Sequence, residues 1–369
     1  MVRPTVPTTI IIACAIVLSV GALLLLVLRG TGSVGGSAAD VTRRGTQARP
    51  IPAALGNHEP IIMAPDATNT SISITLSQAA YPAGSAKSAI LVRDDTWAYA
   101  IATGGLQGVL GAPLLLTPYN RLDPGILAEL RRVGAEKVYL MGDETVLTPT
   151  VALGLSRAGY EVERIGGRDQ IRTSLTTAAQ FMPDAQVAVV LCGHDMPGDR
   201  SRGAVDALAA GAWAAVNRVP VLLTDPFVLS EETRGYLRRS AVKQIVIAGG
   251  SMAVADSVSA ELERLGFTVE RIGGANRYST AVQLAQRWDG HHGFLLIDGS
   301  PERLSAAGFA AAAYAMRANA PVLLANSGTL PPETSAMLRG LREPVQLVCA
   351  PGVEKDPCMT AQEVSAATR

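Results

Sequence analysis

The stretch "VERIGGANRYSTAVQLAQ", residues 269–286, joins a short strand-like segment to a helix-like segment through a pair of glycines. A related stretch, "VERIGGRDQIRTSLTTAAQ", stands earlier in the chain at residues 162–180. In both, the glycines allow a sharp backbone turn, and the apolar spacing of the residues after them predicts a helix. A motif that recurs in one chain indicates a fold built from repeated units.

The repetition extends well beyond this motif. Residues 113–167 align with residues 220–274 without a gap, at an offset of 107 residues. A third copy of the "PVLL" segment begins at Pro321, and "NTSISITLSQAAY" (residues 69–81) is a diverged version of "NRYSTAVQLAQRW" (residues 276–288). The predicted units are residues 61–167, 168–274 and 275–369.

The middle unit alternates short apolar runs with helical stretches. "QVAVVLCG" (residues 186–193) and "VPVLLT" (residues 219–224) are apolar without alternation, as expected for strands that are covered on both faces. "GAVDALAAGAWAAVN" (residues 203–217) is typical of a helix, and Ser230 is expected to cap the next one. Strands that alternate with helices predict parallel sheets with right-handed crossovers. The predicted fold class is α/β: three tandem small doubly wound repeats, flavodoxin-like or Rossmann-like, behind one N-terminal transmembrane helix.

Three segments resemble a known family. They are "RIGGANRYSTA" (residues 271–281), "DALAAGAWAAVNRVPVLLT" (residues 206–224) and "VIAGGSMAVADSVSAEL" (residues 246–262). Together they resemble the cell wall binding repeat 2 family, which occurs in surface proteins and wall-lytic enzymes of Gram-positive bacteria. The resemblance covers the chain beyond the first 60 residues. It implies three repeats around a pseudo-threefold axis and non-covalent binding to an anionic wall polymer.

The repeated motif has two interpretations. In the functional one, the helix after the glycines presents its N-terminal N–H groups, with arginine side chains beside them, to an anion. In the structural one, Asn276 caps the helix, Thr280 bonds back to the turn, and Arg277 and Tyr278 lock one repeat against the next. The candidate polymer-binding residues are Arg271, Asn276, Arg277, Tyr278 and Thr280, with Arg164, Asp169 and Thr173 from the earlier copy.

The copies of the motif differ. In the earlier copy, Gln170 replaces the motif's arginine and Ile171 replaces its tyrosine. Aligned by its asparagine, the copy in the first unit keeps only Asn69 and places Ser73 at the threonine position. These departures reduce the number of side chains that could contact a ligand.

An acidic residue also differs between the units. Asp206 opens the Ala-rich helical segment of the middle unit, whereas Tyr99 and Ala307 stand at that place in the other two. We therefore expect one or two of the three faces to have lost ligand affinity and to serve only in packing.

The N-terminal segment predicts a membrane anchor. Residues 8–28 carry no charge, and 21 residues at about 1.5 Å each are long enough to cross a bilayer. Small residues at 37–40 offer a cleavage site, so removal of the helix stays open. Residues 1–29 are the predicted anchor and residues 30–60, rich in Gly, Ser, Pro and Arg, the flexible linker. We expect a single-pass protein of the cell membrane, with its C-terminal part outside and in contact with the wall.

Composition and motifs argue against several other functions. The chain has 32 basic and 32 acidic residues and 4% aromatic residues, which disfavours nucleic acid as a partner. "AGGSMA" (residues 248–253) lacks the spacing of a nucleotide-binding turn, and neither H-E-x-x-H nor a nucleophile elbow occurs. "CGHDMPGD" (residues 192–199) is explained more simply by a solvated loop than by a metal site. We expect no catalytic residues, no cofactor and no metal.

Cysteine is sparse in this chain. Cys349 and Cys358 could form a disulfide outside the cell, nine positions apart in the last unit. Cys192 is expected to be a buried apolar residue at a strand end.

Three functions fit these observations. The leading hypothesis is a membrane-anchored protein, not an enzyme, whose repeats bind an anionic wall polymer. The second is a small-molecule sensor that uses clefts at the carboxyl ends of its strands. The third is a scaffold that binds another protein of the envelope. Salt-sensitive binding to wall material favours the first, stabilisation by a soluble metabolite the second, and capture of a defined membrane protein the third.

Overall fold

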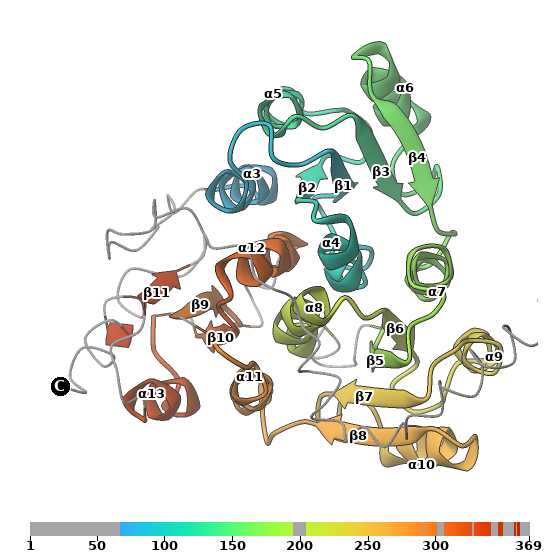
Figure 1. Cartoon of the computed structure of the whole chain (residues 1–369), viewed down its shortest axis with the longest axis vertical. Helices are drawn as coiled ribbons and strands as arrows, with labels where there is room; N and C mark the ends of the chain where they lie inside the picture. Colours follow the sequence, from blue (N-terminus) through green and yellow to red (C-terminus); the bar gives the residue numbers. More distant parts are fainter. Residues whose placement is uncertain are drawn as a thin grey trace, which may run out of the picture. The chain divides into compact units, whose positions relative to one another are not determined.

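The strands that the structure describes form three separate sheets, and every pair of these strands is parallel (Figure 1). The structure, a computed structural model, describes residues 67–194, 204–291, 293–300, 306–326, 328–340, 346–349, 358, 360 and 361. The predicted anchor and linker lie outside the described residues. None of the helices in the described ranges is both long enough and apolar enough to span a bilayer.

The first sheet has the strand order β2-β1-β3-β4. Ile90 of β1 lies opposite Leu114 of β2 on one side and Tyr139 of β3 on the other. The elements are α3 (Asn69–Ala80), β1 (Ser88–Arg93), α4 (Gly104–Leu110), β2 (Leu114–Thr117), α5 (Pro124–Val133), β3 (Lys137–Met141), α6 (Pro149–Arg157) and β4 (Glu161–Ile165).

The second sheet repeats this topology, with the order β6-β5-β7-β8. Its elements are α7 (Gln170–Phe181), β5 (Val187–Cys192), α8 (Val205–Asn217), β6 (Val221–Thr224), α9 (Glu231–Leu237), β7 (Gln244–Ala248), α10 (Asp256–Arg264) and β8 (Thr268–Ile272). The strands and helices predicted for the middle unit are therefore confirmed. Ser230 is the N-cap residue of α9, as predicted, but its hydroxyl donates to Thr233 Oγ1 at 2.9 Å and accepts no helix N–H.

The third sheet shows the order β10-β9-β11 within the described residues. Its elements are α11 (Arg277–Gln286), β9 (Gly293–Asp298), the 3-10 helix η3 (Ala306–Ala310), α12 (Ala311–Ala318), β10 (Val322–Ala325), α13 (Pro332–Arg339) and β11 (Gln346–Cys349). Cys358 is disulfide-bonded, and Cys192 is a buried free thiol.

The inner strands of the sheets are buried on both faces, which explains why they are apolar without alternation, whereas the edge strands β4 and β8 are polar and partly exposed. Equivalent residues on the first strand of each unit (Ile90, Val189 and Leu295) enter one large core that all three units share. The residues that follow them (Leu91, Val190 and Leu296) enter three smaller cores, one for each unit. The helices between the strands therefore cover both sides of each sheet, as in a doubly wound fold.

The shared core contains equivalent helices from the three units, because α4, α8 and α12 pack against one another (Figure 1). A Cβ atom at Gly104 would lie 2.3 Å from the Gly211 carbonyl oxygen, and one at Gly108 would lie 2.0 Å from that of Ala215. Glycine at these positions therefore sets the distance between α4 and α8.

The side chain of Gln107 joins the first unit to the third inside this core. Gln107 is fully buried, and its Nε2 donates to the Phe309 carbonyl oxygen at 3.1 Å. Its Oε1 accepts from the Ala313 N–H at 3.0 Å, where η3 gives way to α12. Both polar ends of the amide are thus satisfied without water.

We expect Gly108→Ala to lower the free energy of unfolding by about 2–3 kcal/mol, because the added methyl group forces two helix backbones apart. The matched control is Gly154→Ala in α6, where a Cβ would come no nearer than 3.4 Å to the Leu122 side chain. That change should stabilise the protein by up to about 1 kcal/mol through helix propensity. Urea unfolding of both variants measures the difference, and a Gly108→Ala protein as stable as the control would contradict this account of the helix contact.

Candidate functional site

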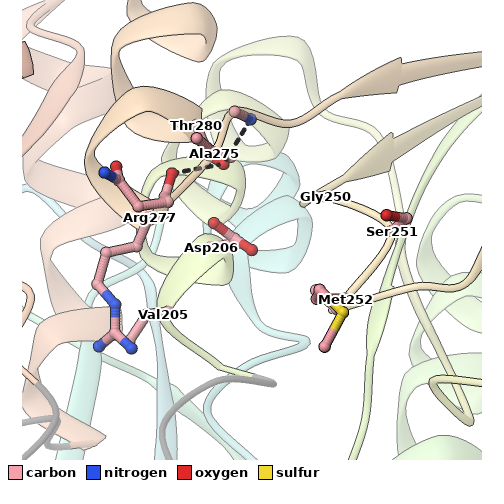
Figure 2. Close-up of a pocket in the computed structure, with 11 residues that line it drawn as sticks. Val205, Asp206, Gly250, Ser251, Met252, Ala275, Arg277 and Thr280 are labelled. Carbon is pink, nitrogen blue, oxygen red and sulfur yellow. Dashed lines mark hydrogen bonds between the residues drawn. The ribbon is translucent and has the colours of Figure 1, made fainter.

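A cleft of about 430 Å³ lies at the carboxyl end of the second sheet (Figure 2). It is formed by the start of α8, the turn between β7 and α10, and the turn between β8 and α11. Loops and helix starts beyond the carboxyl ends of parallel strands are where α/β folds bind ligands. The lining residues are Val205, Asp206, Gly250, Ser251, Met252, Ala253, Gly274, Ala275, Asn276, Arg277 and Thr280.

Asp206 is the buried charged residue of this cleft, with 8% of its surface exposed. Its Oδ1 has no hydrogen-bond partner among the residues that the structure describes. Burial raises the pKa of Asp206 to about 6, and the nearby Thr280 hydroxyl and Arg277 guanidinium offset part of this rise. An unpaired carboxylate oxygen in a cleft indicates a binding site, because buried polar groups normally have partners.

Gly249 makes room for the Asp206 carboxylate. Its φ is +119°, and a Cβ atom there would lie 2.7 Å from Asp206 Oδ2. Only glycine combines this backbone conformation with this space. The turn after β7 is therefore shaped around the acidic side chain.

At the start of α11, the structure places Asn276 as the N-cap. The Ser279 N–H donates to Asn276 Oδ1 at 2.9 Å, and the Asn276 N–H donates to Ser279 Oγ at 3.1 Å. Thr280 Oγ1 accepts from the Gly274 N–H at 3.1 Å and donates to the Asn276 carbonyl oxygen at 3.2 Å. These bonds form a capping box that satisfies N–H groups of the helix start and the turn before it.

Arg277 lines the cleft and also holds its own unit together. Its Nη1 donates to the carbonyl oxygen of Gly299, directly after β9, at 2.9 Å. Gln170 makes the equivalent bond in the middle unit, to the Gly193 carbonyl oxygen at 2.7 Å. Gln170, which replaces the motif's arginine, therefore makes the same bond but carries no charge.

The first unit makes this bond through Asn69, which donates to the Asp94 carbonyl oxygen at 2.7 Å. The cap of α3 is Thr68, whose side chain accepts from the Ser71 N–H. The sequence alignment of Asn69 with Asn276 is therefore wrong by one residue. Asn69 corresponds to Arg277, and Ile72 rather than Ser73 stands at the position of Thr280.

Arg271 and Arg164 lie at equivalent places and hold turns. Arg271 Nη1 donates to the Gly249 carbonyl oxygen at 3.0 Å, and Arg164 donates to the Gly142 and Leu147 carbonyl oxygens at 3.1 and 2.8 Å. Neither arginine lines the cleft. Tyr278 packs against the shared core and does not line the cleft either.

The junction between the first and second units has an equivalent helix cap, but a different residue stands at the place of Asp206. Asp169 accepts from the Arg172 N–H at 2.7 Å, and Thr173 Oγ1 donates to the Asp169 carbonyl oxygen at 2.8 Å. At the place of Asp206 stands Tyr99, whose hydroxyl donates to the Arg168 carbonyl oxygen at 3.0 Å. This junction therefore lacks the buried carboxylate of the second one.

The comparison with protein families identifies these repeats. The family model described as "Cell wall binding domain 2 (CWB2)" matches residues 164–259 and 271–350. Both matched segments belong to this family. The resemblance found in the sequence is thereby confirmed, and every residue that lines the cleft lies inside the two matched segments.

Curated relatives match about half of this chain. N-acetylmuramoyl-L-alanine amidase LytC of Bacillus subtilis is 28% identical over 182 residues, and the amidase enhancer of the same organism is 27% identical over 198 residues. These alignments cover 49% and 54% of this chain, which spans only 34% and 26% of the two relatives.

Two solved structures from Clostridium difficile share the fold. Cwp8 gives a TM-score of 0.70 at 23% identity, over 83% of this chain and 51% of that one. Cwp6 gives a TM-score of 0.70 at 19% identity, over 82% of this chain and 47% of that one. At such identities the likeness establishes the fold and leaves the ligand to be argued from the cleft itself.

We expect Asp206→Asn to stabilise the protein in a pH-dependent way. The pKa of Asp206 is about 6 in the folded protein and 3.8 ordinarily, so ionisation opposes folding above pH 6 and has no effect well below pH 4. The variant should gain about 2–3 kcal/mol of unfolding free energy at pH 7.5 and almost none at pH 3.5.

Urea unfolding at the two pH values measures the effect, and Asp169→Asn is the matched control. Asp169 is a partly exposed helix cap, and asparagine caps equally well, so the control should change little at either pH. A gain for Asp206→Asn that is equal at both pH values would contradict the assignment of a raised pKa.

Proposed function

We propose that this protein binds a polymer of the cell wall non-covalently through the cleft around Asp206. The supporting observation is Asp206 Oδ1, which is buried beside a cleft and lacks a partner among the described residues. A ligand group that donates a hydrogen bond to this oxygen would recover the free energy that its burial costs. Because the cleft is built from cell wall binding repeats, a wall polymer is the ligand that this setting favours.

The proposal includes an anionic polymer and attachment to the membrane. The family resemblance implies the anionic polymer, and Arg277 supplies a permanent positive charge that attracts one. Residues 8–28 hold the chain in the cell membrane, with the repeats on the extracytoplasmic face. In this proposal residues 30–60 serve as the linker between the membrane and the repeats.

The proposed role is binding without catalysis. The cleft offers one carboxylate, whereas glycan hydrolysis commonly uses a pair. No group of three or more His, Cys, Asp or Glu side chains in the described part of the chain could hold a metal ion. Residues 195–199 of the "CGHDMPGD" segment lie outside the described residues.

A soluble small molecule is the second candidate ligand. The cleft volume of about 430 Å³ falls within the usual range of small-molecule sites. This alternative would be favoured by two results together. The protein would fail to bind wall material, and a soluble metabolite would raise the midpoint of its thermal unfolding.

We expect Arg277→Gln to weaken wall binding about tenfold and to leave the fold intact. Glutamine can keep the bond to the Gly299 carbonyl oxygen, as Gln170 does in the middle unit, while the charge in the cleft is lost. The measurement is co-sedimentation of the full-length protein, in a non-ionic detergent, with wall sacculi of its own organism. Sacculi stripped of anionic polymers should not retain the wild-type protein.

The control for this variant is Arg172→Gln, which removes the same charge from an exposed position on α7 outside the cleft. Its wall binding should equal that of the wild type. Failure of the wild-type protein to sediment with intact sacculi would refute the proposed function.

A further inference from the structure

The two ionisable side chains that line the cleft have opposite charges, Asp206 and Arg277. The remaining lining residues are neutral. A compact anion such as phosphate would be repelled by the Asp206 carboxylate, and a compact cation would be repelled by the Arg277 guanidinium. A neutral group that both donates and accepts hydrogen bonds meets neither repulsion.

Three backbone N–H groups at the start of α11 are already used by other groups of the protein. Phosphate binding at a helix N-terminus depends on N–H groups that point at the ligand without another partner. Here the Ser279 and Asn276 N–H groups are used by the capping box, and the Gly274 N–H donates to Thr280.

The start of α8 is also unsuited to an anion. Asp206 stands in the first turn of this helix and places its own negative charge at the positive end of the helix dipole. A phosphate at this point would have to replace or neutralise the carboxylate. The positive end of α8 is therefore already used by the Asp206 carboxylate.

We propose that the part of the wall polymer that enters this cleft is a neutral saccharide unit, whose hydroxyl groups donate to Asp206 Oδ1, and that Asp206 excludes phosphate groups. This inference rests on the proposed function and specifies the chemistry of its ligand. A hydroxyl group donates one hydrogen bond and accepts others, so it suits a carboxylate and a guanidinium in one site. The phosphates of an anionic polymer then lie outside the cleft.

The rim of the cleft fits a sugar ring. The Met252 side chain lines the cleft, and the residue is 66% exposed, so it presents apolar surface at the opening (Figure 2). The Ala253 and Ala275 methyl groups belong to the same lining. A saccharide has C–H groups that can cover such apolar surface while its hydroxyl groups reach the buried carboxylate.

The test is displacement of the full-length protein from sacculi by soluble competitors. One competitor is a preparation of wall polysaccharide fragments from the same organism, used before and after chemical removal of their phosphate. The others are inorganic phosphate and glycerol phosphate, with sodium chloride at matched ionic strength as the control for screening. We expect both fragment preparations to displace the protein, and we expect the two phosphates to act no better than sodium chloride.

Two variants assign the effect to the carboxylate. Asp206→Asn should bind the dephosphorylated fragments at least about tenfold more weakly, because a charge-assisted hydrogen bond is lost. Since the same change is expected to stabilise the fold, weaker binding cannot be attributed to unfolding. Asp184→Asn, the same change at an exposed position outside the cleft, should bind within about twofold of the wild type.

Two results would overturn the inference. They are displacement by glycerol phosphate beyond the sodium chloride control, and fragments that lose their effect when phosphate is removed. In either case the wild-type protein still sediments with sacculi, so the proposed wall binding stands. Absence of sedimentation would instead refute the proposed function and this inference with it.

Discussion

The close contact between α4 and α8 is the constraint on which the arrangement of the repeats depends. Gly104 and Gly108 leave no room for a side chain between the two helix backbones, and these helices form part of the core shared by all three units. A packed interior transmits a change in helix spacing instead of absorbing it. Because Asp206 stands at the start of α8, the same contact fixes the position of the carboxylate relative to the turn before α11. The cleft is thus a consequence of how the units pack.

Asp206 is retained in a place where it opposes folding. Burial raises its pKa to about 6, and the Thr280 hydroxyl and the Arg277 guanidinium compensate only in part for the lost hydration. Tyr99 at the equivalent position shows that this fold accepts a residue without that penalty. A group that lowers stability where a harmless one would fit is typical of a site kept for function.

The sequence predicted the elements of the middle unit because buried parallel strands form apolar runs that cannot be mistaken for alternating edge strands. It failed where hydrogen bonds decide between neighbouring residues. Serine is a residue type that suits a helix cap, yet the Ser230 hydroxyl donates its hydrogen bond to Thr233. In the first unit, Asn69 was aligned with Asn276 because both are asparagine. In the structure, however, the N-cap of α3 is Thr68. Residue type alone could not reveal this shift of one position.

The candidate site was only partly visible in the sequence for a related reason. The motif around Arg277 is conspicuous because it serves packing in every unit, and most of its residues turn out to hold caps and turns. Asp206 is a single acidic residue at the start of an Ala-rich helix, and its sequence signal was the tyrosine or alanine found in its place elsewhere. A repeated motif indicates what all units need, whereas a residue present in one unit alone indicates what that unit does.

Comparison of Arg277 with its equivalents distinguishes what all units need from what one unit does. Arg277, Gln170 and Asn69 all donate to the carbonyl oxygen that follows the first strand of their unit, so this bond belongs to the fold. A neutral amide is sufficient for it in two of the three units. The positive charge of Arg277 occurs at the junction that also holds the buried carboxylate of Asp206. Of the two junctions built from turns that the structure describes throughout, this one pairs both charges in a cleft, which is why the binding site is placed there.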